Sequence, residues 1–151
     1  RDVLPLDIGL GAFALSGDDS STTDYEGWNP VYSRWPKWSD LYIYTLVNER
    51  GVAYWENMGT GWLQLAWNTN PHVQIKAQLM WMWAFEAAPD PASPVFGDGD
   101  FRGLLSKVRL NWNWTDYLSG HFLWEMLDPG DYYAEGSDNS HFLRWELYLK
   151  Y

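Results

Sequence analysis

Five of the ten lysine and arginine residues fall within short segments in which charged and apolar positions alternate. These five are Lys76, Lys107, Arg109, Arg144 and Lys150. Lysine acts on an anion as a point charge, and arginine can hold a carboxylate through two parallel hydrogen bonds. A strip of such side chains attracts anions, most strongly in a narrow channel with low-dielectric walls. We therefore expect a surface that binds an anionic solute.

The predicted solute-binding set combines four of these cations with two further residues of the polar positions. Its members are Lys76, Lys107, Arg109, Arg144, His121 and Glu125. Some of the charges could instead pair across neighbouring strands with Glu125 or Glu146 and stiffen the wall. For the two arginines both roles stay open, whereas we expect the two lysines, Lys76 and Lys107, to remain free for solute.

The formal net charge of -10 conceals this strip, because most of the twenty acidic residues lie in the connections between the segments. Nucleic acid is not an expected partner, since no basic surplus exists to neutralise its phosphates. Some connection carboxylates are ligands of the kind that calcium, or a cation bridging lipopolysaccharide, prefers: Asp98, Asp100, Asp128, Asp131 and Asp138. Their spacing matches no known calcium loop, so we favour plain solvation and predict neither a metal nor a cofactor.

Aromatic residues make up 19% of the chain, with twelve Trp and ten Tyr. Trp and Tyr are enriched where a membrane meets water, because each ring has an apolar body and a polar tip. Three residues of the first long connection, Trp28, Trp35 and Trp38, could also stack against sugar rings. A soluble β-sandwich that binds carbohydrate is therefore the alternative from another class. A non-conducting structural barrel in a surface assembly is a further alternative.

Ser119, His121 and Glu125 share one face of a predicted strand and could suggest a hydrolase. However, Ser119 and His121 are two residues apart, which separates them by about 7 Å along a strand. The sequence has no Gly-x-Ser-x-Gly elbow and no pair of histidines at metal-binding spacing. We therefore predict no catalytic residues and no enzyme activity.

The elements that carry these side chains are predicted by a period of two in six segments. Apolar and polar residues alternate over residues 4–14, 61–68, 72–83, 104–114, 118–126 and 143–151. Strict alternation over this length predicts strands with one apolar face. That face carries no charged residue in any segment, and a charge facing lipid costs about 2–4 kcal/mol at the bilayer midplane. We therefore predict an all-β, antiparallel transmembrane barrel whose apolar face meets lipid and whose polar face lines a lumen.

The connections alternate between short and long, as they do in outer-membrane barrels, where the short turns face the periplasm. Short turns are expected around 68–71 and 115–117, and long loops at 17–57, 86–101 and 128–140. The first long loop is expected to be extracellular or inserted into the lumen. Its apolar stretch 41–47 could form a further strand, but the charged and Gly-containing residues 48–51 interrupt it. We favour an apolar piece folded into the lumen.

Aromatic residues near the strand ends are expected to form girdles at the two membrane surfaces. The periplasmic girdle would contain Trp67, Trp112, Trp114 and Tyr151. The outer girdle would contain Trp81, Trp83, Trp124 and Trp145. Both girdles would contact lipid or lipopolysaccharide, which places the chain in the outer membrane of a bacterial cell.

Six strands are too few for a barrel of this kind. A lumen that holds bulky inward side chains needs about eight strands or more, and hydrocarbon does not tolerate the unpaired edges of an open sheet. We expect residues 1–151 to form one barrel segment, completed by strands of the same longer chain, of other copies or of a partner chain. The first residue is Arg1, as in an exported mature protein or a fragment.

The final segment, Phe142-Leu-Arg-Trp-Glu-Leu-Tyr-Leu-Lys-Tyr151, resembles the terminal signal of bacterial outer-membrane proteins. Those chains end in an aromatic residue that follows apolar residues at alternate positions. This resemblance implies a barrel without specifying which one.

A narrower resemblance covers most of the chain. Its elements are Trp28-Asn-Pro-Val-Tyr32, Lys37, Leu41-Tyr42, the bend at 48–51, a hairpin, Gly103, Leu118-Ser-Gly-His-Phe122 and Asp128-Pro-Gly-Asp-Tyr132. In this order they resemble the C-terminal part of the alginate export family of outer-membrane porins. The stretch Ser33-Arg-Trp-Pro-Lys-Trp38 departs from the Gly-His-Lys-like sequence that is common in that family. The resemblance implies a barrel of about eighteen strands whose basic lumen passes an anionic polysaccharide.

Overall fold

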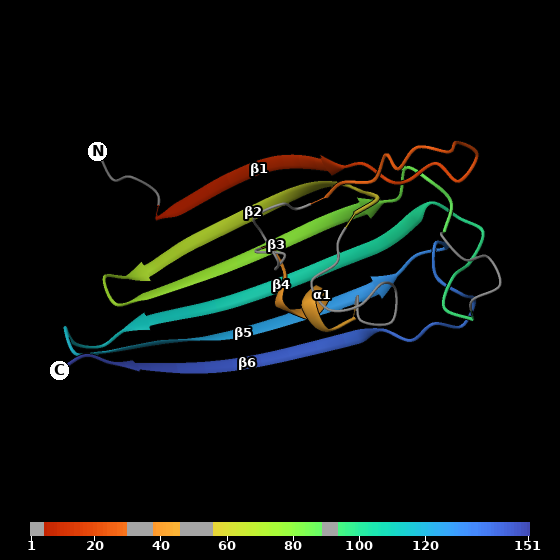
Figure 1. The fold of residues 1–151 in the computed structure, drawn as a ribbon. Coiled ribbons are helices and arrows are strands. Elements are labelled where there is room, and N and C mark those ends of the chain that lie inside the picture. Colours follow the sequence, from red (N-terminus) through yellow and green to blue (C-terminus); the bar gives the residue numbers. More distant parts are fainter. Residues whose placement is uncertain (1–4, 30–37, 46–55, 89–93) are drawn as a thin grey trace.

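A computed structural model of the chain describes residues 5–29, 38–45, 56–88 and 94–151. These residues form an all-β fold, in which one antiparallel sheet of six strands carries a short helix (Figure 1). The strand order along the sheet equals the order along the chain, so the sheet is a simple meander. The elements are β1 (Leu6–Leu15), α1 (Asp40–Thr45), β2 (Met58–Asn70), β3 (Val73–Trp83), β4 (Phe101–Asn113), β5 (Leu118–Pro129) and β6 (Ser140–Leu149).

The six predicted strands are confirmed, and the period of two that predicted them is preserved across the sheet. Residues directly opposite each other in antiparallel strands point to the same face. One row across the sheet is therefore apolar from edge to edge: Ile8, Leu65, Ala77, Val108, Trp124 and Leu143. Several strands extend further toward the long connections than the alternation alone indicated.

A bulge near the loop end of β3 and β4 shifts the register between Met82 and Trp83. Gly103 lies opposite Met82 and has a φ of 127°, in the region that favours glycine. A side chain there would also meet the backbone, because a Cβ atom would lie 2.2 Å from the carbonyl oxygen of Asp128. The glycine therefore permits both the bulge and the close approach of β5.

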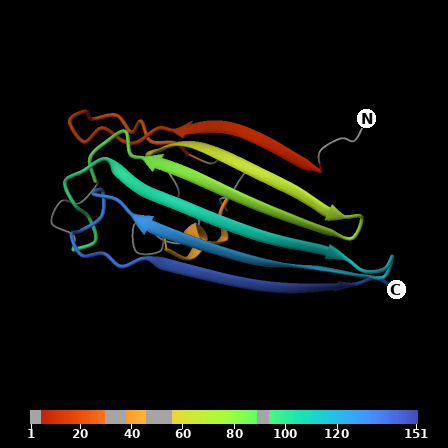
Figure 2. The ribbon, with the colours of Figure 1, turned by 180° about the vertical axis from the view of Figure 1, so that it is seen from behind.

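The connections segregate to opposite ends of the sheet, as Figures 1 and 2 show from two sides. The tight β2–β3 and β4–β5 turns lie at one end, together with the start of β1 and the end of β6. The three longer connections lie at the other end. The sheet thus has a short-turn end and a loop end, which is the alternation that the sequence predicted.

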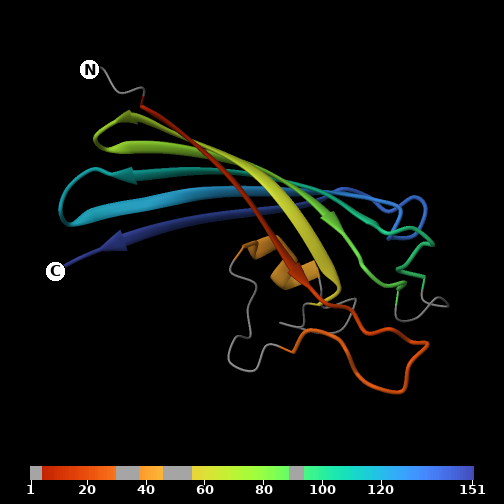
Figure 3. The same ribbon diagram turned by 90° about the horizontal axis from the view of Figure 1, so that it is seen from above.

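The sheet is curved, and its two faces differ in chemistry. Figure 3 shows the strands arching over α1, which lies on the concave side. The convex face presents large apolar side chains that no other described residue covers, among them Leu10 (81% exposed), Ile8 (67%) and Leu143 (65%). The six strands belong to one sheet, so the described residues contain no second sheet to cover this face as in a β-sandwich.

The apolar core lies on the concave face, near the loop end. Buried residues of the sheet pack there against the helix segment: Leu15, Met58, Met80, Met82, Leu105 and Leu127, together with Leu41 and Tyr42. The polar face predicted from the alternation is therefore only half polar. The half of this face near the loop end is apolar, because Met80 and Met82 of β3 and Leu105 of β4 occupy positions where the alternation predicted polar side chains.

Residues 40–45 of the first long loop form a helix, which the sequence analysis did not foresee. Ser39 precedes the helix, and its Oγ accepts a hydrogen bond from the amide of Tyr42 at 3.1 Å, as an N-cap does. Asp40 stands in the first turn, where the helix dipole favours negative charge. The β-forming types at 41–44 made a strand the natural alternative, but the cap and the packing of Leu41 and Tyr42 favour a helix.

The structure places the aromatic residues that were expected to form girdles. Trp81 and Trp83 lie at the loop end of β3, while Trp112 and Trp114 stack on each other at the short-turn end. Trp145 lies in the middle of β6, in the same transverse row of the sheet as Trp67. The assignment of these residues to two membrane girdles stays a prediction. Within the described ranges, no helix has the length and apolar character to cross a membrane.

Candidate functional site

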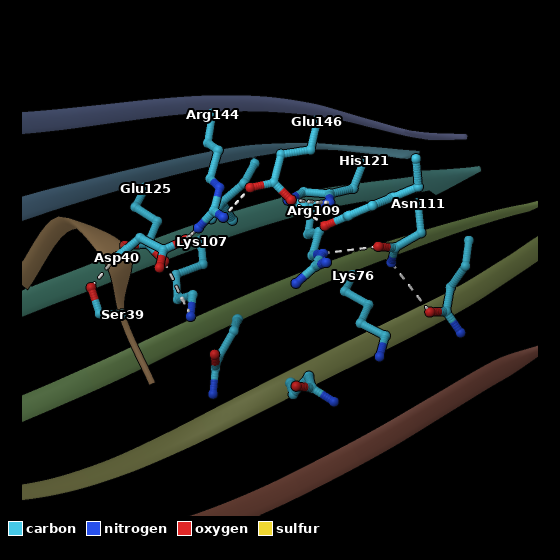
Figure 4. A pocket seen from close by; sticks show the side chains of 15 residues that line it. Ser39, Asp40, Lys76, Lys107, Arg109, Asn111, His121, Glu125, Arg144 and Glu146 are labelled. Carbon is cyan, nitrogen blue, oxygen red and sulfur yellow. Dashed lines mark hydrogen bonds and ion pairs between the residues drawn. The ribbon is translucent and has the colours of Figure 1, made fainter. Parts of the chain in front are cut away.

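The short-turn half of the concave face contains a cavity of about 670 Å³ (Figure 4). Side chains from β2 to β6 line it, together with the residues at the start of α1. All six residues of the predicted solute-binding set lie in its wall: Lys76, Lys107, Arg109, His121, Glu125 and Arg144. The alternation of polar and apolar residues predicted that these six side chains share one face, and the antiparallel register places them on neighbouring strands at similar heights.

The register arranges the cavity wall as three transverse rows. The row nearest the loop end contains Gln64, Gln78, Lys107 and Glu125. The middle row contains three cations, Lys76, Arg109 and Arg144, with Leu123 between the two arginines. The row nearest the short turns contains Gln74, Asn111, His121 and Glu146. The middle row therefore contains three of the five cations of the basic strip that the sequence predicted, Lys107 lies in the next row, and Lys150 does not line the cavity.

Glu125 is the most deeply buried charged side chain of the wall, with an exposure of 0%. One of its carboxylate oxygens accepts hydrogen bonds from Ser39 Oγ and from the amide of Leu41, each at 2.7 Å. The other lies 3.2 Å from Lys107 Nζ. A buried carboxylate costs much free energy unless it is paired and hydrogen-bonded, and these three donors provide both.

Lys107 corrects the expectation that both cavity lysines remain free. Besides its ion pair with Glu125, Lys107 Nζ donates a hydrogen bond to the carbonyl oxygen of Trp38. The ammonium group therefore holds the residues before α1 against the sheet. The sequence could not show the hydrogen bond to Trp38, because the loop that supplies Trp38 is far away along the chain.

The two arginines have different partners. Arg144 lies 3.0 Å from Asp40 Oδ2 and also pairs with Glu146, so it stands between two carboxylates. Arg109 donates from Nε to Asn111 Oδ1 at 2.8 Å. Among the described residues, no carboxylate lies within ion-pair distance of Arg109 or of Lys76. These two cations of β3 and β4 are the available positive charges of the cavity.

A chain of amide side chains continues from Arg109 across β4, β3 and β2. Asn111 Nδ2 lies 3.5 Å from Gln74 Oε1, and Gln74 Nε2 donates to Asn68 Oδ1 at 2.8 Å. Amides offer both donors and acceptors, so this part of the wall suits neutral hydroxyl groups. Cations and amides side by side can contact a solute that carries both anionic and hydroxyl groups.

His121 lies in the cavity wall with an exposure of 4%, stacked on the ring of Tyr148. Its Nδ1 is 3.8 Å from a carboxylate oxygen of Glu146. Ser119, which shares the polar face of β5, does not line the cavity. The arrangement therefore joins His121 to a tyrosine and a carboxylate, and not to Ser119.

Two of the three loop aromatics predicted to contact solute lie in the described residues. Trp38 is partly buried and packs against Phe13 and Tyr42, with ring centroids 5.8 Å and 4.7 Å apart, so part of its ring surface is used within the protein. Trp28 is 43% exposed and remains open to solvent. Trp35 lies outside the described residues.

Ser39 and Asp40 line the cavity although they lie outside the predicted strands, and the sequence did not suggest this position. The signal that these residues do carry is Ser-Asp directly before an apolar stretch, which is a helix N-cap followed by an acidic first turn. Leu123 was also missed, because it interrupts the polar alternation of β5. For the loop acids, the described part of the chain contains no group of three or more His, Cys, Asp or Glu side chains that could hold a metal ion.

Comparisons of the chain with protein-family models, with curated proteins and with solved structures find no match. The function is therefore argued from the two faces of the sheet and from the cavity.

Proposed function

We propose that this chain forms part of the wall of a bacterial outer-membrane β-barrel, a channel that passes anionic solutes through a locally basic lumen. In this arrangement the convex face of the sheet meets lipid. The concave face, with its cavity, faces the lumen. The resemblance to the alginate export family extends the proposal to an anionic, alginate-like polysaccharide as solute.

The uncovered convex face is the observation that carries this proposal. Its central row consists of Ile, Leu, Ala, Val and Trp side chains, and the outermost side chains of that row, on β1 and β6, are largely exposed. Water-soluble proteins rarely expose apolar patches beyond a few hundred Å². In a bilayer the same face replaces apolar–water contact with apolar–lipid contact, so its lack of charge becomes favourable.

The edges of the sheet support a barrel that extends beyond these six strands. β1 pairs only with β2, and β6 pairs only with β5, among the described strands. Each edge therefore presents unpaired backbone groups, which hydrocarbon does not tolerate. We propose that further strands, from the same longer chain, from other copies or from a partner chain, close the ring.

The cavity supports passage of anions. Four basic and three acidic side chains line it, so its wall has a positive excess although the whole chain is acidic. Among the described acidic residues of the long connections, Asp40 alone lines the cavity. A local positive field within low-dielectric walls raises the local concentration of anions.

The soluble carbohydrate-binding sandwich explains these features less well. It needs a second sheet over the apolar face, and Trp38, one of its proposed sugar platforms, is used for packing. A structural barrel without conduction would explain the apolar convex face equally well. It gives no role to Lys76 and Arg109, which have no carboxylate partner among the described residues, and we therefore favour a channel. We propose no enzymatic activity for it.

Two measurements test the proposal on the protein purified from membranes in detergent. We expect heat-modifiable gel migration and channel conductance in planar bilayers, with a preference for chloride over potassium. Replacing Lys76 or Arg109 by Glu should lower the chloride/potassium permeability ratio at least about twofold, since each change reverses an available charge in the lumen. Lys150→Glu, which makes the same charge change outside the cavity, is the matched control.

Each outcome separates the candidate functions. A water-soluble protein that needs no detergent would contradict the barrel. A membrane protein without conductance would favour the structural barrel. Conductance with equal permeability ratios for Lys76→Glu, Arg109→Glu and Lys150→Glu would contradict the role of the cavity.

A further inference from the structure

Residues 38–42, which we call the strap, reach across the concave face and touch the cavity at one side. Two strap donors, Ser39 Oγ and the amide of Leu41, bind the buried carboxylate of Glu125. The carbonyl oxygen of Trp38 accepts a hydrogen bond from Lys107. Leu41 and Tyr42 are buried in the apolar core next to these contacts. The strap is thus fixed both by a polar anchor and by apolar packing.

The strap also carries a charge into the cavity. Asp40 Oδ2 lies 3.0 Å from a guanidinium nitrogen of Arg144, on β6. No strand supplies this carboxylate, because Asp40 belongs to the first long loop and reaches Arg144 only while the strap is held on the sheet. Figure 4 shows Asp40 and Ser39 beside Glu125, with Lys76 away from them.

The basic residues of the cavity consequently fall into two pairs. Lys107 is neutralised by Glu125, and Arg144 by Asp40 and Glu146. Lys76 and Arg109 have no carboxylate within ion-pair distance among the described residues. The cavity therefore has a compensated side, next to the strap, and a cationic side on β3 and β4.

We propose that Asp40 is a selectivity-determining residue, and that the strap decides which cations of the channel an anion meets. This inference rests on the proposed channel function. With Asp40 in place, three acidic side chains oppose four basic ones in the wall. Without it, the positive excess of the wall doubles, and Arg144 becomes partly available. The selectivity of the lumen is then set by a loop segment, in addition to the strands.

Asp40 and Glu146 both contact Arg144, but only Asp40 depends on the strap. Glu146 belongs to the same strand as Arg144 and also accepts a hydrogen bond from Tyr148. A variant that loosens the strap without changing any charge therefore isolates the role of Asp40. Ser39→Ala is such a variant, since it removes both the N-cap of α1 and one hydrogen bond to Glu125.

The first measurement needs no conductance. The protein in detergent, in the form in which the cell assembles it, is treated with phenylglyoxal, which modifies accessible arginines, and the rates are mapped by mass spectrometry. We expect Asp40→Asn and Ser39→Ala each to raise the modification rate of Arg144 about threefold or more, because a charge-assisted hydrogen bond is lost. The rate for Arg109 should not change. Ser119→Ala, the same substitution outside the cavity, is the matched control.

The second measurement is the chloride/potassium permeability ratio in planar bilayers. Asp40→Asn and Ser39→Ala should both shift the ratio toward chloride by about twofold, and Ser119→Ala should not. If only Asp40→Asn changes Arg144 reactivity or selectivity, the strap does not deliver the charge and the proposal is overturned. If neither variant changes Arg144 reactivity, Asp40 is not its effective partner, which also overturns it.

The two measurements keep the two proposals apart. Absence of conductance from the unaltered protein would refute the channel, and with it the selectivity role of Asp40. The labelling rates would still show whether the strap compensates Arg144. Conductance of the unaltered protein, together with unchanged labelling and permeability in both variants, would refute the role of the strap alone.

Discussion

Glu125 illustrates how a single side chain joins two distant parts of the chain. It lies on β5, opposite Lys107 of β4, and it accepts hydrogen bonds from Ser39 and Leu41, more than eighty positions earlier in the chain. One oxygen of this fully buried carboxylate accepts both hydrogen bonds, and the other faces the ammonium group of Lys107. Removal of this carboxylate should therefore affect both the strap and the sheet.

We expect Glu125→Ala to lower the free energy of unfolding by about 3–5 kcal/mol, since it leaves Lys107 without its buried partner. It also leaves the hydroxyl of Ser39 and the amide of Leu41 without their acceptor. The measurement is urea-induced unfolding in lipid vesicles, followed by tryptophan fluorescence.

Glu146→Ala is the matched control, because Glu146 is a solvent-accessible acid of the same concave face and its removal should lower the free energy of unfolding much less. A double variant, Glu125→Leu with Lys107→Met, should recover much of the loss, because a paired charge is replaced by apolar packing. Equal destabilisation by Glu125→Ala and Glu146→Ala would contradict the anchoring role.

At the scale of the elements, each strand separates two environments. Gln64 and Leu65 of β2 are neighbours in the chain, yet Gln64 lines the cavity and Leu65 belongs to the apolar convex row. The pleat of the strand alone produces this difference. The proposed lipid face can therefore be tested by placing the same charge at both positions.

Leu65→Arg should lower the free energy of unfolding in a bilayer by about 2–4 kcal/mol, the cost of a basic residue facing lipid near the midplane. Gln64→Arg should cost less than about 1 kcal/mol, because its side chain enters a hydrated lumen. Urea unfolding in lipid vesicles measures both. A soluble protein would show the opposite order, since a charge on an exposed apolar surface is tolerated there.

At the scale of the whole molecule, the open sheet is the dominant feature. Its curvature and its unlike faces fit the proposed barrel wall, whereas its six strands, with two unpaired edges, are too few to enclose the lumen that the inward side chains need. The loop end carries the acidic connections, and the short-turn end carries stacked tryptophans. Such polarity between the two ends fits a channel with two different openings.

Native mass spectrometry of the detergent-solubilised particle should therefore give a mass above that of one 17.6 kDa chain. We expect enough polypeptide for about eight strands or more, supplied by a longer chain, by further copies or by a partner. A stable, membrane-embedded particle that contains a single chain of residues 1–151 would contradict the proposed ring.

The sequence alone determined the six strands, their two faces and the members of the basic strip. The reason is local: a strand turns each successive side chain to the opposite face, so alternation predicts both the strand and its orientation. The six predicted cavity residues lie together because the short turns and the matching apolar rows leave one register.

The pairing of the cavity charges was decided only by the tertiary structure. Lys107, expected to be free, is held by Glu125, whereas Arg109, for which pairing was left open, has no carboxylate partner among the described residues. The register places Glu125 directly opposite Lys107, whereas Leu123 lies opposite Arg109. The strap, whose position depends on packing of Leu41 and Tyr42 against strands far away in sequence, then holds both Glu125 and Lys107. Alternation specifies which face a charge occupies, but a loop that folds back across that face decides whether the charge is available.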